Sequence, residues 1–402
     1  MTTLTSPLER LHDWQCDLRA QFPILTANPA VAYLDSAATG QKPRAVLDAV
    51  AEFLTTTNAN IGRGSYPWAN TATERVAQVR QRVRLALGDT AGDTASTVEF
   101  VSGTSHGLRA VANDWLADIL ADGDEIIVPF GDHQANLRPW LDLRDTLALR
   151  GVRIGVVPMP VDPTSGDYDH RALPALVTPR TRFVAATHVH HVYGANMNVH
   201  RIREAVGPDV PICLDAAQSV GHGPVSVADL DVDFIVFSGH KMLALTGVGA
   251  VWARNRRGPH FALRGWEGTP NTAGIVSLGA AFDWLDAAGL DRVREWSTAL
   301  GVLLTDSLSR MADVEVLGCQ RSLTADSDVQ RREGIVTFRH RKVRSDDLGF
   351  VLADEGIMVR ADSHCQAGRD SADRAVRVSP HVYNTPDEID RLLSVVRRCE
   401  GI

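Results

Sequence analysis

The sequence predicts an α/β fold, with a large domain built on a mostly parallel seven-stranded sheet and a smaller C-terminal α+β domain. Between about residues 97 and 255, seven short apolar runs alternate with stretches of helical periodicity, which indicates βαβ units. After about residue 285 the order of strands and helices changes and is typical of an α+β domain. The length of 402 residues leaves room for two or three domains.

The seven apolar runs are expected to be the strands of the large sheet. They are Thr97–Val101, Glu125–Pro129, Val152–Pro158, Arg182–Thr187, Pro211–Asp215, Asp233–Ser238 and Gly247–Ala253. Helical periodicity predicts helices over Gly107–Leu120, Ala135–Leu149, Asp169–Leu176 and Val199–Val206. Because open α/β sheets bind ligands beyond the carboxyl ends of their strands, residues at those ends are the first candidates for chemistry.

The two ends of the chain are expected to flank this sheet. Residues 7–22 read as one amphipathic helix. The elements predicted for the C-terminal part are a helix Ala280–Met311, strands Val314–Val316 and Gly334–Arg339, a helix Ser345–Glu355, strands Met358–Ala361 and Ala375–Ser379, and a helix Pro386–Arg398 capped by Thr385. The predicted division is a helical segment 1–30 packing on the small domain, a large domain 31–284 and a small domain 285–402.

Composition excludes several classes of function. The 41 basic residues against 49 acidic ones give a net charge of −8, which disfavours a nucleic-acid or anionic-membrane binder. Five cysteines, at 16, 213, 319, 365 and 399, lack the CxxC spacing of structural zinc sites, so no metal is expected. Without an apolar signal-peptide core or a run of membrane-spanning length, we expect a cytoplasmic protein.

Two strand ends carry groups that suit a carbonyl cofactor. Lys241 follows the strand Asp233–Ser238 and is either a surface lysine or a partly desolvated amine that forms a Schiff base. Asp215 ends the preceding strand and is either a helix cap or a carboxylate placed against a pyridinium nitrogen. Gln218, one turn later, is then placed to bond the phenolic oxygen of the same ring.

A third strand end resembles a phosphate site. Thr104 and Ser105 open a helix after a glycine turn, which is either a plain cap or an anion site, and Ser238 and His240 add further polar contacts. A lysine, a carboxylate and a phosphate cradle together predict pyridoxal 5'-phosphate (PLP). Neither GxGxxG after the first strand nor GxxxxGK[ST] occurs, which disfavours dinucleotides and P-loop nucleotides.

From about Ala32 to Arg397 the chain resembles the fold-type I, class V aminotransferase-like PLP enzymes, most closely the group II cysteine desulfurases. The motifs that carry the resemblance, in the family's order, are YLDSAATGQKP, NANIGRG, ATERV, GTSHG, GDHQANLRPW, CLDAAQSVGH, FSGHKM, EGTPNTAG, VRADSHC and RVSPHVYNT. The series is specific for cofactor and fold and less specific for the reaction.

The resemblance implies roles for the cofactor-side residues. Lys241 would bind the cofactor covalently, Asp215 would pair with the pyridinium nitrogen, and Gln218 with the phenolic oxygen. His133 would stack on the ring and assist proton transfer. The residues implied for the phosphate are Thr104, Ser105, Ser238 and His240, with Thr269 reaching the phosphate of a neighbouring subunit. A homodimer with shared active sites is therefore implied.

The resemblance also implies a substrate pocket and a nucleophile. Arg377 would grip the α-carboxylate of an amino acid, which suits the bidentate geometry of arginine. The other implied lining residues are Ala37, Ala38 and Arg360, with Arg63 near the dimer-related site. Cys365, in a polar loop beside His364, matches the persulfide-forming cysteine. The implied reaction converts L-cysteine to L-alanine and a Cys365 persulfide, which passes its sulfur to an acceptor, such as an acceptor protein.

Departures from the family pattern keep other reactions open. His191 stands where the family has an asparagine that touches the cofactor or the substrate carboxylate, and Gly62 and Gln134 each replace a histidine. The segment 254–266 is shorter than the family's glycine-rich hairpin region. The alternatives are a PLP-dependent C–S lyase acting on cysteine or a conjugate, a selenocysteine lyase, or transamination, epimerisation or cyclisation. A scaffold without activity has no need of Lys241, Asp215 and Arg377.

Overall fold

The structure, a computed structural model, describes residues 6–90, 96–162, 165–264, 268–318, 332–367 and 374–399. A seven-stranded sheet runs in the order β2-β8-β7-β6-β5-β3-β4. Its strands are β2 (Thr97–Val101), β3 (Glu125–Pro129), β4 (Gly155–Met159), β5 (Thr181–Thr187), β6 (Ile212–Asp215), β7 (Phe234–Ser238) and β8 (Gly249–Ala253). Only β8 pairs antiparallel with its neighbours, β2 and β7. The predicted mostly parallel seven-stranded sheet is confirmed.

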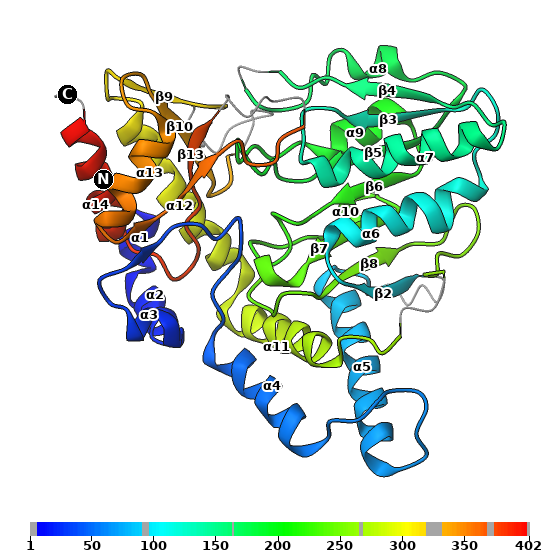
Figure 1. The fold of residues 1–402 in the computed structure, drawn as a ribbon, viewed down its shortest axis with the longest axis horizontal. Helices are drawn as coiled ribbons and strands as arrows, with labels where there is room; N and C mark the ends of the chain where they lie inside the picture. The colour runs from blue at the N-terminus through cyan, green and yellow to red at the C-terminus, as the bar shows by residue number, and fades with distance from the viewer. Residues whose placement is uncertain are drawn as a thin grey trace, which may run out of the picture.

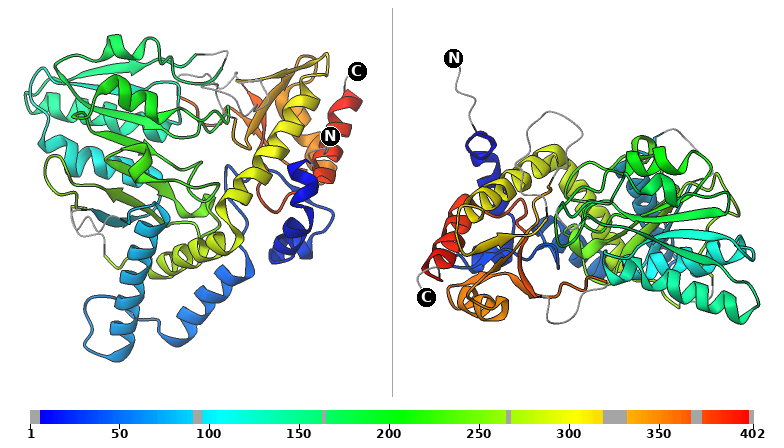
Figure 2. Two further views of the ribbon diagram at one scale, coloured as in Figure 1. Left: turned by 180° about the vertical axis from the view of Figure 1, so that it is seen from behind. Right: turned by 90° about the horizontal axis from the view of Figure 1, so that it is seen from above.

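Both faces of this sheet are buried, and alternate residues of each strand serve different cores. In β7, Ile235 and Phe237 join the core under α9 (Val199–Val206) and α10 (Val227–Leu230). Phe234 and Val236 join the core under α6 (Thr104–Ala110) and α7 (Arg138–Leu149), which cover the opposite face in Figures 1 and 2. Gly107 permits this packing, because a Cβ there would lie 2.4 Å from the Val236 side chain.

A second sheet lies beside the first in Figure 1, in the order β12-β13-β10-β9. Its strands, all antiparallel, are β9 (Val314–Val316), β10 (Val336–His340), β12 (Arg360–Asp362) and β13 (Ala375–Val378). The helices around it are α12 (Leu290–Leu308), α13 (Ser345–Asp354) and α14 (Pro386–Cys399). A parallel pair, β1 (Ala32–Tyr33) with β11 (Ile357–Met358), joins the N-terminal segment to this part of the molecule.

Two helices project from the body as an arm, at the bottom of Figure 1. They are α4 (Arg44–Thr56) and α5 (Pro67–Ala86), and α11 (Thr272–Ala288) packs against both. Within the described ranges no single helix is long and apolar enough to span a membrane, although α11 and α12 pass that test as a pair bent by 79°.

Three predicted helices are interrupted. The prediction of a single helix over residues 7–22 is wrong, because α1 (Pro7–Arg10) and α2 (His12–Arg19) are separated at Leu11. A third helix, α3 (Pro23–Ala27), begins at a proline, where the missing N–H removes no hydrogen bond within the helix. Ala280–Met311 is also wrong as one helix, because Gly289 takes a φ of +86° between α11 and α12. Gly107–Leu120 leaves the α-helical geometry after Ala110 and continues as a π-helical turn and a 3₁₀ turn.

Other boundaries are corrected more lightly. Asp169–Leu176 contracts to α8 (Leu173–Leu176), and Ala135–Leu149 begins with a 3₁₀ turn before α7. Met358–Ala361 is split between β11 and β12, which belong to different sheets. The remaining predicted strands and helices agree to within a few residues, and Thr385 caps α14 by accepting from Glu388 N at 3.3 Å.

Candidate active site

The carboxyl ends of five strands meet at one edge of the large sheet, because β2, β3, β5, β6 and β7 all run in the same direction. Each is followed by residues predicted from the sequence. These are Thr104 and Ser105 after β2, His133 after β3, His191 after β5, Asp215 and Gln218 at β6, and Ser238, His240 and Lys241 at β7. The topology thus gathers candidates that are far apart in the chain.

Lys241 ends the short 3₁₀ turn that follows β7. The pKa of its amine is lowered to about 8, chiefly by burial and also by the nearby Arg377 and Arg360, while the Asp215 carboxylate opposes this shift. An amine with such a pKa is largely protonated at neutral pH but has an appreciable free, nucleophilic fraction.

Asp215 lies near this amine, and Gln218 follows it by three residues. Asp215 is buried, and its Oδ1 accepts from Ala217 N at 3.0 Å. Burial raises the pKa of the carboxyl group, whereas the Ala217 N–H and the Lys241 charge lower it. Gln218 donates Nε2 to Ala37 O at 2.9 Å, which brings the predicted substrate residue Ala37 to the same place. Gln218 Oε1 is buried without a partner among the described residues.

The predicted phosphate residues come together at the start of α6. Ser238 Oγ accepts from Thr104 N at 2.8 Å and lies 2.7 Å from Thr104 Oγ1. Ser105 follows on the exposed side of the helix. His240 is half-buried, and burial, then the Lys241 charge, lower the pKa of its imidazole to about 4. Hydroxyls and backbone N–H groups at this helix start suit an anion.

His133 presents a neutral ring at the same edge. Its Nδ1 accepts from Ala135 N at 3.1 Å, so Nε2 carries the hydrogen. Its pKa is lowered to about 4, chiefly by burial and also by the charges of Lys241 and two arginines. The ring meets His191 edge to face, with centroids 5.0 Å apart.

The second sheet supplies the two arginines and the cysteine. Arg377 on β13 is 1% exposed and donates Nη1 to His191 O and Nη2 to Asp35 Oδ1, each at 3.1 Å, while its Nε has no partner among the described residues. Arg360 pairs with it in register from β12. Cys365 is exposed, and its Sγ is 3.4 Å from Arg360 Nη2.

Comparison with known proteins identifies the family. The class-V aminotransferase profile matches residues 32–392, which is most of the chain. The chain belongs to the class-V aminotransferase family. Cysteine desulfurases from Cronobacter sakazakii and Escherichia fergusonii are each 34% identical to it, over 94% and 95% of this chain and 96% and 97% of theirs. The predicted family resemblance is confirmed.

Solved structures agree with this assignment. The apo cysteine desulfurase from Thermococcus onnurineus NA1 superimposes on this class-V aminotransferase with a TM-score of 0.82 and 25% identity over 100% of both chains. The cysteine desulfurase CsdA from Escherichia coli gives 0.78 and 28%, over 99% of both chains. The fold-type I prediction is thereby confirmed.

The two residues of this class-V aminotransferase that were predicted to serve a neighbouring subunit lie at the surface. Thr269 is exposed just before α11, and Arg63 is exposed between α4 and α5. Their assignment to the site of a neighbouring subunit stays a prediction. The segment 254–266 is described as far as residue 264. Ion pairs from Arg254 and Arg256 to Asp231 hold its first residues. Its last residues, and Cys319, lie outside the described residues.

Sequence reasoning missed two acidic residues of the site. Asp35 pairs with Arg377, and burial raises the pKa of its carboxyl group while that arginine opposes the shift. Asp132 is fully buried, accepts from Tyr168 Oη at 2.6 Å, and has a pKa raised by burial to about 7. Both lie inside motifs already singled out, YLDSAATGQKP and GDHQAN. An acidic residue within a motif expected to be buried could therefore have identified them from the sequence.

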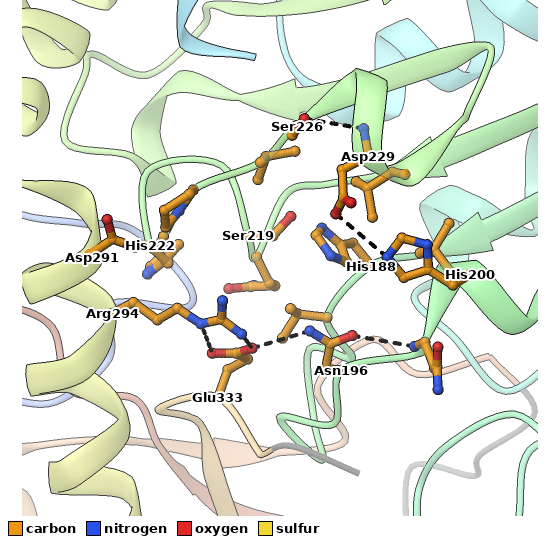
Figure 3. A pocket seen from close by; sticks show the side chains of 18 of the residues that line it. His188, Asn196, His200, Ser219, His222, Ser226, Asp229, Asp291, Arg294 and Glu333 are labelled. Atoms are coloured by element: carbon orange, nitrogen blue, oxygen red, sulfur yellow. Dashed lines mark hydrogen bonds and ion pairs between the residues drawn. The ribbon is translucent and has the colours of Figure 1, made fainter. Parts of the chain in front are cut away.

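A separate cavity of about 480 Å³ lies behind Gln218 and is shown in Figure 3. His188, Ser219 and His222 line one side, and the ion pair of Arg294 with Glu333, at 2.8 Å, lines another. Lys241, His133 and Cys365 do not line it. Within the described residues, no group of three or more His, Cys, Asp or Glu side chains is arranged to hold a metal ion.

Proposed function

We propose that this chain is a PLP-dependent cysteine desulfurase that converts L-cysteine to L-alanine and a persulfide on Cys365. The observation that carries the proposal is electrostatic and geometric. Cys365 Sγ lies 3.4 Å from Arg360 Nη2, and the Arg360 charge is close enough to lower the pKa of the Lys241 amine, so both nucleophiles lie near the same arginine. The relatives named cysteine desulfurase, at 34% identity, support the same reaction.

The residues present fit PLP by the chemistry of their side chains. Lys241 has a partly deprotonated amine that would bind the aldehyde, Asp215 a buried carboxylate that would pair with the pyridine nitrogen, and His133 a neutral ring that would stack on the cofactor. The residues that would hold the phosphate are Thr104, Ser105, Ser238 and His240. When bound, PLP supplies an electron sink for the substrate α-carbon.

The chain's own groups then divide the work. Arg377 and Arg360 would orient the substrate α-carboxylate, since the two guanidinium groups lie on paired residues of neighbouring strands. The Lys241 amine would take and return the α-proton of the substrate, because a pKa of about 8 suits both roles at neutral pH. His133 Nε2–H is a neutral donor at the same edge of the sheet.

Cys365 would take the sulfur. Its thiolate attacks the substrate sulfur, forming an S–S bond while the bond between the substrate β-carbon and sulfur breaks. The electron pair of the broken bond stays on the carbon fragment, whose β-carbon takes a proton and leaves as alanine. Cys365 and the transferred sulfur remain as a persulfide, and the exposure of Cys365 leaves it open to an acceptor.

Product analysis tests this function. We expect the PLP-loaded protein, incubated with L-cysteine and a thiol reductant, to release alanine and sulfide in equal amounts. Pyruvate and ammonia in place of alanine would instead make the chain a C–S lyase. Absence of any turnover of L-cysteine would overturn the proposal in favour of another substrate.

We further propose a homodimer with shared active sites. The arm formed by α4 and α5 exposes large apolar side chains, with Leu54 and Tyr66 each 50% exposed and Trp68 59% exposed. Such a patch is typical of an interaction surface, and Arg63 lies on the same arm. Sedimentation velocity tests the proposal, because a single species of monomer mass contradicts it.

The rate of PLP capture by the apo-protein is expected to depend on pH. Only the unprotonated amine attacks the aldehyde, and the pKa of Lys241 is about 8, so the rate should rise about tenfold per pH unit below 8 and level off above it. In Asp215→Asn the midpoint should move to lower pH, since the carboxylate raises that pKa. Stopped-flow absorbance measures both, and a rate independent of pH contradicts the assignment of Lys241.

A further inference from the structure

The loop of residues 363–367, named here the Cys365 loop, belongs to the second sheet but lies against the first. Cys365 O accepts from Gln134 N at 3.1 Å, and Ala367 N donates to Asp132 O at 2.7 Å. Gln366 donates Nε2 to Gly131 O at 2.8 Å. The nucleophile is therefore laid along residues 131–134, the segment that also carries His133.

The backbone of this loop is strained at the nucleophile. His364 and Cys365 have φ values of +56° and +57°, in the left-handed region that residues other than glycine rarely occupy. Two such residues in succession persist only where surrounding contacts hold them. The contacts that hold His364 and Cys365 in this conformation therefore keep the nucleophile in place.

His191 provides a contact at this point. Its ring is 4% exposed, and Nε2 lies 3.0 Å from the carbonyl oxygen of His364. A carbonyl only accepts, so Nε2 carries the hydrogen and donates it. Burial and the neighbouring His190 lower the pKa of His191 well below its usual value. The ring therefore remains neutral around pH 7 and keeps its Nε2–H donor.

The ring of His191 is held on two sides. His133 meets it edge to face, with centroids 5.0 Å apart, and His190 stacks on it at 4.9 Å. His190 is itself fixed, since its Nδ1 accepts from Val192 N and Tyr193 N at 3.2 Å and its Nε2 lies 3.3 Å from Gly131 O. The donor aimed at the Cys365 loop is thus rigidly placed.

We propose that His191 is a positioning residue that anchors the strained Cys365 loop through the His364 carbonyl and so fixes the thiol over the substrate. Its consequence for catalysis rests on the proposed function, whereas the anchoring itself does not. An asparagine at this position places its amide nitrogen near the Nδ1 position of histidine, short of the carbonyl. A glutamine carries its nitrogen near the Nε2 position and retains the donor.

The test compares His191→Asn with His191→Gln. His188→Asn is the matched control, because His188 is also a buried histidine, with a pKa lowered by burial to about 4, and its Nδ1 has no partner among the described residues. Hydrogen exchange of the Gln134 and Ala367 amides in the apo-protein reports on docking of the loop without cofactor or turnover. We expect about tenfold faster exchange in His191→Asn, and change within about twofold in the other two variants.

Kinetics of the PLP-loaded variants give a second readout. His191→Asn should lower kcat for alanine formation by about 10²-fold with little change in KM or PLP capture, because a displaced thiol slows only sulfur transfer. Equal exchange in His191→Asn and wild type, or His191→Gln behaving like His191→Asn, overturns the anchor. If exchange responds as expected but the wild type releases no alanine, the anchor stands and the proposed reaction fails.

Discussion

Replacement of Lys241 by alanine is expected to lower turnover of L-cysteine by about 10⁴-fold or more. The variant loses the amine that captures the aldehyde and the base that moves the α-proton. Among the described lysines, only Lys241 follows the carboxyl end of β7. The Asp215 carboxylate lies close enough to Lys241 to oppose the lowering of its pKa. Alanine release measures turnover, and reduction with borohydride followed by peptide mass analysis shows whether the cofactor is attached to residue 241.

Lys42→Ala is the matched control for this experiment. Burial lowers the pKa of Lys42 to about 8 as well, but its amine donates to Thr39 Oγ1 and Gly40 O instead of facing the carboxylate of Asp215. A perturbed pKa alone therefore does not distinguish the two lysines, whereas their positions do. Loss of covalent PLP in Lys42→Ala with retention in Lys241→Ala is the result that would contradict our assignment.

The sequence was informative where an apolar strand ends in a polar motif. Asp215 and Lys241 lie in runs whose burial is evident from composition, and parallel topology brings their ends together. Pattern alone could not locate the helix break at Gly289, because apolar residues continue on both sides of it. The φ of +86° there is set by how α11 and α12 pack on different cores.

Contacts between distant segments were beyond sequence reasoning. Arg377 was predicted to bind a carboxylate, but its pairing with Asp35, across 342 positions, depends on the bridge between Asp35 and Ser379 at the junction of the two sheets. His191 and His364 are 173 positions apart and meet only because the Cys365 loop crosses to residues 131–134. The sequence identified His191 as unusual, and the fold supplies its partner.

The electrostatics of the site separate two kinds of group. Burial lowers the pKa of His133, His191 and His364 far enough that all three are neutral at working pH. The positive charge that meets an anionic substrate therefore comes from Arg360 and Arg377, which stay protonated throughout. Neutral rings can stack and donate without competing with the arginines for the carboxylate.

Replacement of Cys365 by alanine is expected to lower alanine formation from L-cysteine by about 10³-fold or more, while binding of PLP and of substrate is retained. The thiol is the only described cysteine near this site: Cys213 and Cys399 are buried in hydrophobic cores, and Cys16 is exposed on α2. Without it the carbon–sulfur bond has no acceptor for its sulfur, so any residual reaction should be elimination to pyruvate. Chromatography of both products measures the partition.

Cys16→Ala supplies the matched control, because Cys16 is also an exposed free thiol but lies outside the site. It should keep wild-type alanine formation, and mass analysis of the wild type should place one added sulfur atom on Cys365. Full activity in Cys365→Ala would exclude this cysteine as the sulfur acceptor and remove the main support for desulfuration. Unchanged pyruvate formation in the same variant would then assign the site to β-elimination. That reaction needs Lys241 to remove the α-proton and the arginines to bind the carboxylate, but it needs no nucleophile to accept the sulfur.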